Sequence, residues 1–192
     1  MILTQKFLID KAIERKITSN VSLERLLEQS CETFSMQNVF DLFISHSFLD
    51  KNLIATLVSL FNELNYSVYV DWLNDLSLDR NKVSSKTASI IKTRIENCRG
   101  LAYVATNNIA NSKWCPWELG LADGLHNGKS CILPIMKEAN SFKGTEYLGL
   151  YPYIEYEKIK GKNSYDFLDS SSGRSTKVFT FKILARWKNL IK

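Results

Sequence analysis

Four short, nearly unbroken apolar runs follow residue 38 of the chain. They are Val39–Ser45, Ser67–Val70, Leu101–Thr106 and Cys131–Met136. A strand that is covered on both faces of a sheet gives such a run, whereas a strand with one face in water alternates between apolar and polar residues. Tyr153–Tyr156 is a candidate fifth strand. The runs therefore predict a parallel sheet of about five strands.

The segments between the runs have helical spacing instead. Apolar residues lie three or four positions apart in Leu53–Leu64, Ile90–Ile95 and Trp117–Leu125. Strands that alternate with helices in this way form parallel sheets with right-handed crossovers and helices on both faces. The sequence thus predicts a three-layer α/β domain, and we expect a last helix through Val178–Ile191.

Residues 1–37 form a separate helical extension in this interpretation, ahead of a main domain at 38–192. One helix is expected around Phe7–Ile13, and a second, with Ser22 as its cap, around Val21–Phe34. We expect the extension to pack on the main domain or to support self-association. Two polar segments, Asp71–Lys82 and Lys160–Lys177, are expected to be loops.

Composition narrows the possible partners. The net charge of +5 is mild, and no block of lysines and arginines points to nucleic acid. No apolar run approaches the ~20 residues that cross a bilayer, and the N-terminus does not resemble a secretory signal. Four cysteines without a Cys-x-x-Cys pair and two distant histidines argue against a metal site. We expect a cytoplasmic protein with reduced thiols.

Ligands of open parallel sheets bind beyond the carboxyl ends of the strands. Three segments leave those ends: Ser45–Phe48, Asp71–Lys82 and Thr106–Lys113. The third leads directly into Trp114-Cys115-Pro116-Trp117-Glu118. Pro116 suits the first turn of a helix, which places Glu118 near the third helical position. The helix dipole favours an ionised carboxylate there.

The position of Glu118 by itself fits a capping residue as well as a catalyst. Helical projection places it at the edge of the buried stripe, beside Leu121, Ala122 and Leu125, so that it faces the end of the sheet. Trp114 and Trp117 are more often core residues than ligand platforms. Glycines recur every four residues along this helix and are expected to allow close packing against its neighbours: Gly120, Gly124 and Gly128.

Two motifs resemble those of TIR (Toll/interleukin-1 receptor) domains. Phe40-Asp41-Leu42-Phe43-Ile44-Ser45-His46 resembles the family's first strand, and Ser112-Lys113-Trp114-Cys115-Pro116-Trp117-Glu118-Leu119 resembles its Ser-x-Trp-Cys-x-x-Glu-Leu segment. The second motif also fits the Trp-x-x-x-Glu pattern of bacterial TIR enzymes. The resemblance covers about Val39 to Ile159. It implies a flavodoxin-like fold.

The resemblance also implies a site. Catalytic members of the family carry a glutamate at the position of Glu118, and Trp114 matches an aromatic residue at the nicotinamide end of the pocket. Further substrate-binding positions match the loops after the first and second strands, at Ser45, His46, Ser47, Asp71 and Trp72. The second loop contains Asp79-Arg80-Asn81 and lacks the Pro-Gly pair of animal TIR domains.

The implied reaction is cleavage of the nicotinamide–ribosyl bond of NAD+, a substrate, with no cofactor and no metal. The product is ADP-ribose, a cyclic isomer or a conjugate. Implied partners are further copies of the chain in a homo-oligomer and a separate effector protein that responds to the product. The nearest resemblance in role is to TIR proteins of anti-phage defence systems such as Thoeris.

Three other functions stay open on the sequence alone. A non-catalytic TIR adaptor would only self-associate or bind other TIR domains. A cysteine enzyme would use Cys115 with His46, because a cysteine near a helix start has a lowered pKa. A nucleoside-processing enzyme would cleave a related glycosidic bond and would also depend on the ionised carboxylate of Glu118.

Overall fold

The structure is a computed structural model that describes residues 2–15, 17, 39–64, 66–75, 83–138, 146–158 and 165–169. The predicted second N-terminal helix and the predicted C-terminal helix lie outside these residues. So does most of the predicted loop after the second apolar run.

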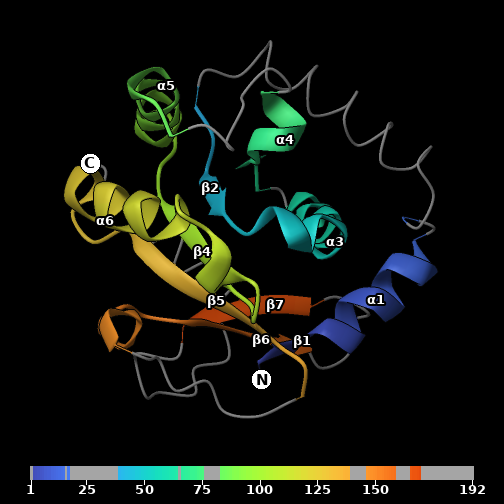
Figure 1. The fold of residues 1–192 in the computed structure, drawn as a ribbon. Helices are drawn as coiled ribbons and strands as arrows, with labels where there is room; N and C mark the ends of the chain where they lie inside the picture. The colour runs from blue at the N-terminus through green and yellow to red at the C-terminus, as the bar shows by residue number, and fades with distance from the viewer. Residues whose placement is uncertain are drawn as a thin grey trace.

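A five-stranded parallel sheet forms the centre of the fold (Figure 1). Its strands are β1 (Leu3–Thr4), β2 (Leu42–Ser45), β3 (Val68–Tyr69), β4 (Leu101–Ala105) and β5 (Ser130–Met136). Their order is β1-β5-β4-β2-β3. Every residue of β2 and β4 is buried, as expected for strands with helices on both faces. The four apolar runs are thus confirmed as strands.

Helices cover both faces of the sheet. One face carries α1 (Gln5–Glu14), α3 (Lys51–Glu63) and α4 (Asp71–Asn74), and the other carries α5 (Ser85–Glu96) and α6 (Cys115–His126). Each face has its own apolar core, built around side chains such as Leu57 and Leu133 on the first and Ile95 and Leu119 on the second. The three-layer flavodoxin-like α/β architecture is confirmed. Short 3-10 turns are η1 (Phe48–Asp50), η2 (Ile109–Asn111) and η3 (Glu146–Leu150).

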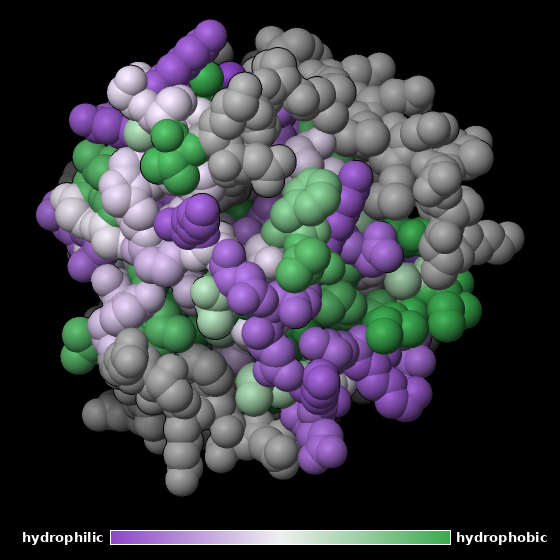
Figure 2. All heavy atoms as spheres, in the orientation of Figure 1, coloured by the Kyte–Doolittle hydropathy of each residue, from purple (hydrophilic) through white to green (hydrophobic). Residues whose placement is uncertain are grey.

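Hydroxyl caps begin two of these helices. The Thr4 hydroxyl accepts from the Phe7 amide ahead of α1, and the Ser84 hydroxyl accepts from the Thr87 amide ahead of α5, each at 3.1 Å. Such caps satisfy amides that the first helical turn leaves unpaired. The helices within the described ranges are all too short or too polar to cross a bilayer. In Figure 2 an apolar area lies over α1, where Ile9 and Ile13 are exposed.

The fifth strand differs from the prediction. Tyr153 forms a single parallel bridge to Ile132 of β5, and β6 (Ile154–Lys158) then pairs with β7 (Tyr165–Asp169) in a separate antiparallel ribbon. The edge place in the main sheet goes to β1, where Leu3 is the register partner of Ile135. The sequence pattern missed β1 because Leu3 is followed directly by the polar residues Thr4, Gln5 and Lys6, so no apolar run like the other four is present.

Three further expectations are corrected. Asp71–Asn74 were expected to begin a loop but form the single helical turn α4. Residues 165–169 were expected to lie in a loop but form β7, because pairing with β6 supplies backbone hydrogen bonds that composition does not reveal. The expected close packing at the glycines of α6 is also wrong. A Cβ added at Gly120 or Gly124 would meet nothing within 4 Å, because the face that packs on the sheet is the one bearing Glu118 and Leu119.

The first part of the predicted N-terminal extension is integrated into the core. Leu3 and Leu8 are fully buried, and α1 packs along α3. The guanidinium of Arg15 also donates two hydrogen bonds of 2.7 Å to the Glu63 carboxylate at the end of α3.

Candidate active site

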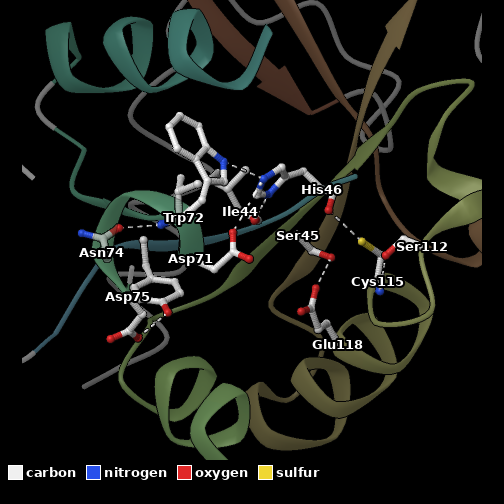
Figure 3. A network of polar contacts seen from close by, with 12 residues as sticks. Ile44, Ser45, His46, Asp71, Trp72, Asn74, Asp75, Ser112, Cys115 and Glu118 are labelled. Carbon is white, nitrogen blue, oxygen red and sulfur yellow. Dashed lines mark hydrogen bonds and ion pairs between the residues drawn. The ribbon is translucent and has the colours of Figure 1, made fainter. Parts of the chain in front are cut away.

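Glu118 lies in the first turn of α6, at the carboxyl end of the sheet, and is fully buried. The hydroxyl of Ser45, the last residue of β2, donates a 2.6 Å hydrogen bond to its Oε2 atom (Figure 3). These two residues are 73 positions apart in sequence. The fold thus brings the glutamate of the second motif onto the end of the strand that carries the first.

The start of α6 follows from its local sequence. The Ser112 hydroxyl accepts from the Cys115 amide at 3.2 Å, and Pro116 occupies the first turn, where a missing N–H costs nothing. The Cys115 thiol donates to the backbone carbonyl of His46 at 3.1 Å. This bond ties α6 to the loop after β2 and was not anticipated from the sequence, since Cys115 was weighed there only as a motif residue or a nucleophile.

Opposing effects act on the charge of Glu118. Complete burial disfavours an ionised carboxylate, whereas the amides of the first turn of α6 and the Ser45 hydroxyl stabilise one. Tyr103 of β4 is close enough to Glu118 to respond to its charge. Burial raises the pKa of Tyr103, and hydrogen bonding to Tyr147 and the negative charge of Glu118 raise it further. Tyr103 therefore stays protonated at neutral pH.

His46 points to the opposite face of the sheet from Ser45, because side chains alternate along a strand and its continuation. Its Nδ1 lies 2.9 Å from the carbonyl oxygen of Ile44, and its Nε2 accepts from the Trp72 indole at 2.9 Å. An Asp71 carboxylate oxygen is farther from Nε2, at 3.7 Å. His46, Trp72 and Asp71 are all buried, so the structure groups them as a cluster at the end of β3.

Ser47 and Trp114 are the remaining residues that the sequence placed at the site. Ser47 is buried, and its carbonyl accepts from the Asp50 amide at 2.9 Å at the start of η1. Trp114 is buried and meets the ring of Trp117 edge-on, with 5.5 Å between centroids. Trp117 is 40% exposed, so within this pair the indole open to solvent belongs to a variable position of the Trp-x-x-x-Glu motif, and the defining position, Trp114, is covered.

Asp50 is a residue that sequence reasoning missed. Its buried carboxylate accepts from the Thr106 hydroxyl at 2.5 Å and from the side-chain amide of Asn108 at 2.6 Å. These bonds join the loop after β2 to the loop after β4. The sequence offered only the positions of Asp50, Thr106 and Asn108 as a signal. All three follow strands whose carboxyl ends were predicted to lie at the same edge of the sheet.

The geometry does not assemble a cysteine–histidine pair. Nε2 of His46 accepts the Trp72 N–H and so cannot also take a proton from a thiol. Nδ1 of His46 carries the hydrogen that faces the Ile44 carbonyl and has no lone pair to offer. The described part of the chain contains no group of three or more histidine, cysteine or acidic residues placed to hold a metal ion. Burial raises the pKa of the Cys98 thiol. Cys98, Cys115 and Cys131 are all buried, and none of these three forms a disulfide.

A family model described as "TIR domain" matches residues 42–170, about two thirds of the chain. The chain belongs to the TIR-domain family. The match includes Ser45 and Glu118, so the paired residues at the sheet edge lie inside a TIR domain.

Two relatives extend this assignment. The chain is 42% identical over 148 residues to a Bacillus cereus (strain MSX-D12) protein named "Probable 3' cyclic ADP-D-ribose synthase ThsB'", and the match covers 75% of this chain and 76% of that protein. It is 38% identical over 104 residues to a Cytobacillus dafuensis protein with the provisional name cyclic ADP-D-ribose synthase TIR2. That match covers 53% of this TIR protein and 27% of the relative.

Proposed function

We propose that this TIR protein is an NAD+-processing enzyme that breaks the nicotinamide–ribosyl bond and closes the remaining ADP-ribosyl group into a cyclic ADP-ribose. The observation that carries the proposal is the Glu118 carboxylate, held at the start of α6 and bonded to Ser45 at the end of β2. The 42% identity to a protein named as a cyclic ADP-D-ribose synthase supports the class of product.

Glu118 acts in this reaction through its negative charge. When the bond from C1′ of the ribose to the nicotinamide nitrogen breaks, the electron pair goes to nicotinamide, which leaves neutral and needs no proton. The ribose becomes an oxocarbenium-like cation. A fixed carboxylate beside it stabilises this charge more in the transition state than in the substrate, which is the requirement for catalysis.

A hydroxyl or adenine nitrogen of the same molecule then captures the cation. The new bond forms at C1′, and an attacking hydroxyl loses its proton as the ring closes. Capture by water would give linear ADP-ribose instead. Cyclisation therefore requires a site from which water is excluded. The burial of Ser45, Trp114 and Glu118 supports such a site, and side chains that cover Glu118 have to move to admit the substrate.

Ser45, Ser47, Asp71 and Trp114 complete the proposed site. Ser45 orients Glu118 directly. Ser47 offers its hydroxyl to the dinucleotide, Asp71 borders the same strand ends, and the indole of Trp114 stacks on nicotinamide. No cofactor is required, since NAD+ is the substrate.

The decisive experiment compares Glu118→Gln with Glu96→Gln. Glu96 is a partly exposed carboxylate near Lys92 on α5 and serves as a matched control. Purified proteins are incubated with NAD+, and the products are separated by chromatography and weighed by mass spectrometry. We expect the wild type and Glu96→Gln to release nicotinamide and a product one water lighter than ADP-ribose, and Glu118→Gln to release neither. Nicotinamide release by a folded Glu118→Gln protein would remove Glu118 from the mechanism.

The biological role in this proposal is bacterial anti-phage defence in the cytoplasm. The cyclic product activates a separate effector protein, and the TIR chains assemble into a homo-oligomer to become active. An active oligomer makes the rate rise more steeply than in proportion to protein concentration. A rate strictly proportional to concentration across a range that spans assembly would contradict the oligomer requirement. It would not contradict the proposed bond cleavage and cyclisation.

A further inference from the structure

The loop after β2 is held from both faces of the sheet. On the α6 face, Ser45 donates to Glu118 and the backbone carbonyl of His46 accepts from Cys115. On the opposite face, the His46 imidazole bonds to Trp72 of α4 (Figure 3). The three residues from Ser45 to Ser47 are buried. The position of the loop is therefore set jointly by α6 and by the His46–Trp72 contact.

The contacts of His46 fix its protonation pattern. An indole N–H can only donate, so Nε2 of His46 must be the acceptor in the 2.9 Å bond to Trp72. A carbonyl oxygen can only accept, so Nδ1 carries the hydrogen in the 2.9 Å contact with Ile44. His46 is thus a neutral imidazole with its proton on Nδ1, and each ring nitrogen is engaged with a protein atom.

Trp72 is itself held in place. It lies in α4, a single helical turn that is closed by two hydrogen bonds between Val70 and Asn74. The Val70 amide donates to the Asn74 side-chain oxygen at 2.7 Å, and the Asn74 backbone amide donates to the Val70 carbonyl at 2.8 Å. The ammonium of Lys51 sits 4.6 Å from the centre of the Trp72 ring, a cation–π distance. The indole is therefore a rigid donor, and its orientation determines where the His46 ring lies.

We infer that His46 and Trp72 form a positioning pair, which acts by holding the backbone of the β2 loop so that Ser45 orients the Glu118 carboxylate. Neither polar group of the pair is directed to substrate. This inference rests on the proposed function. It differs from the family resemblance, which implies that both residues contact the dinucleotide. A displaced Ser45 changes the geometry in the transition state, so the pair affects kcat more than KM.

The first test separates positioning from direct contact. Trp72→Phe keeps an aromatic ring and removes the N–H donor, and His46→Leu removes both ring nitrogens. With NAD+ as substrate, we expect each to lower kcat by roughly tenfold, the rate equivalent of one lost hydrogen bond, with KM changed less than about twofold. A raised KM with unchanged kcat would identify direct substrate contact and overturn the inference.

The second test uses rescue and coupling. In His46→Gln the side-chain oxygen can still accept from Trp72, so we expect kcat to stay within about threefold of wild type. The double variant His46→Leu/Trp72→Phe should be no slower than the slower single variant, because both changes delete the same bond. If the kcat losses of the two single variants multiplied in the double variant, His46 and Trp72 would have separate roles, and the inference of a positioning pair would be refuted.

Controls keep the outcomes distinct. His126→Gln alters the other histidine, which bonds to the Ile95 carbonyl at the opposite end of the sheet, and should leave kcat unchanged. Thermal melts report folding of every variant. Lower melting temperatures with unchanged kcat and KM would show that the pair is merely structural and would also overturn the inference. Absence of nicotinamide release by the wild type would instead contradict the proposed function.

Discussion

The two ends of the parallel sheet each bury a carboxylate, and they treat it differently. At the amino end, Asp41 accepts from the Arg99 guanidinium at 2.8 Å and from both the amide and the hydroxyl of Ser67, at 3.0 and 2.9 Å. At the carboxyl end, Glu118 accepts from the neutral hydroxyl of Ser45 and is fully buried. Asp41 is thus paired with a cation, the Arg99 guanidinium. The hydrogen bond from Ser45 to Glu118 comes from a neutral donor.

The difference separates a structural charge from a candidate catalytic one. Asp41 joins the starts of β2, β3 and β4, and a partner cation offsets the cost of burying it. In the proposed reaction, the charge of Glu118 stabilises a cation that forms in the site, the developing ribosyl cation. Stability is thus expected to depend on the amino end, and turnover on the carboxyl end.

The largest expected effect comes from exchanging the two acids for amides. Glu118→Gln should lower turnover by at least about a hundredfold, the usual loss when an electrostatic stabiliser is removed, with no loss of stability, because a buried neutral amide lacks the desolvation cost of a buried charge. Asp41→Asn should keep turnover per folded molecule and lower the free energy of unfolding by about 1–3 kcal/mol. Urea denaturation and nicotinamide release measure the two quantities. If Asp41→Asn instead lost turnover while remaining folded, the division between the ends would be wrong.

A smaller effect is expected from the two serines that serve these acids. Ser45→Ala removes the donor to Glu118 and should lower kcat by roughly tenfold, the rate equivalent of one hydrogen bond. Ser67→Ala removes the hydroxyl that donates to Asp41 and should cost about 1 kcal/mol of stability with kcat unchanged. Steady-state kinetics and melts of both variants check this. Equal kcat for wild type and Ser45→Ala would mean that Glu118 is oriented without Ser45.

The smallest effect concerns pH at the amino end. Burial lowers the pKa of His126, and the nearby Lys129 lowers it further. Because the folded pKa lies below the unfolded value of about 6.5, the unfolded chain binds more protons as pH falls below that value, and stability decreases there. His126→Gln should lessen this decrease. Denaturation curves at pH 7.5 and pH 5.5 compare the two proteins, and identical pH dependence would contradict the assignment.

Much of the fold could be predicted from periodicity. The runs that became β2 to β5 are long enough to show continuous burial, and the helices between them, α3, α5 and α6, have clear apolar spacing. The edge strand β1 was not predicted, and the strand predicted at Tyr153–Tyr156 was placed in the main sheet, whereas β6 pairs with β7. Leu3–Thr4 gives no apolar run like those of β2 to β5, and the partner of β6 depends on tertiary contacts that the sequence pattern does not encode. The solvent-facing glycines of α6 were misjudged because spacing alone does not reveal which face is buried.

The sequence by itself determined the motif that carries Glu118 and the start of its helix, since Ser112, Pro116 and the first-turn carboxylate are local signals. It also determined that three strand ends would meet at one edge, because parallel strands share their carboxyl ends. Only the tertiary structure decided which residues at that edge touch. The pleat of β2 sends Ser45 toward Glu118 and His46 toward Trp72, so neighbours in sequence serve opposite faces of the sheet. Hydrogen bonds between residues 26 and 73 positions apart depend on register and packing, which no local pattern encodes.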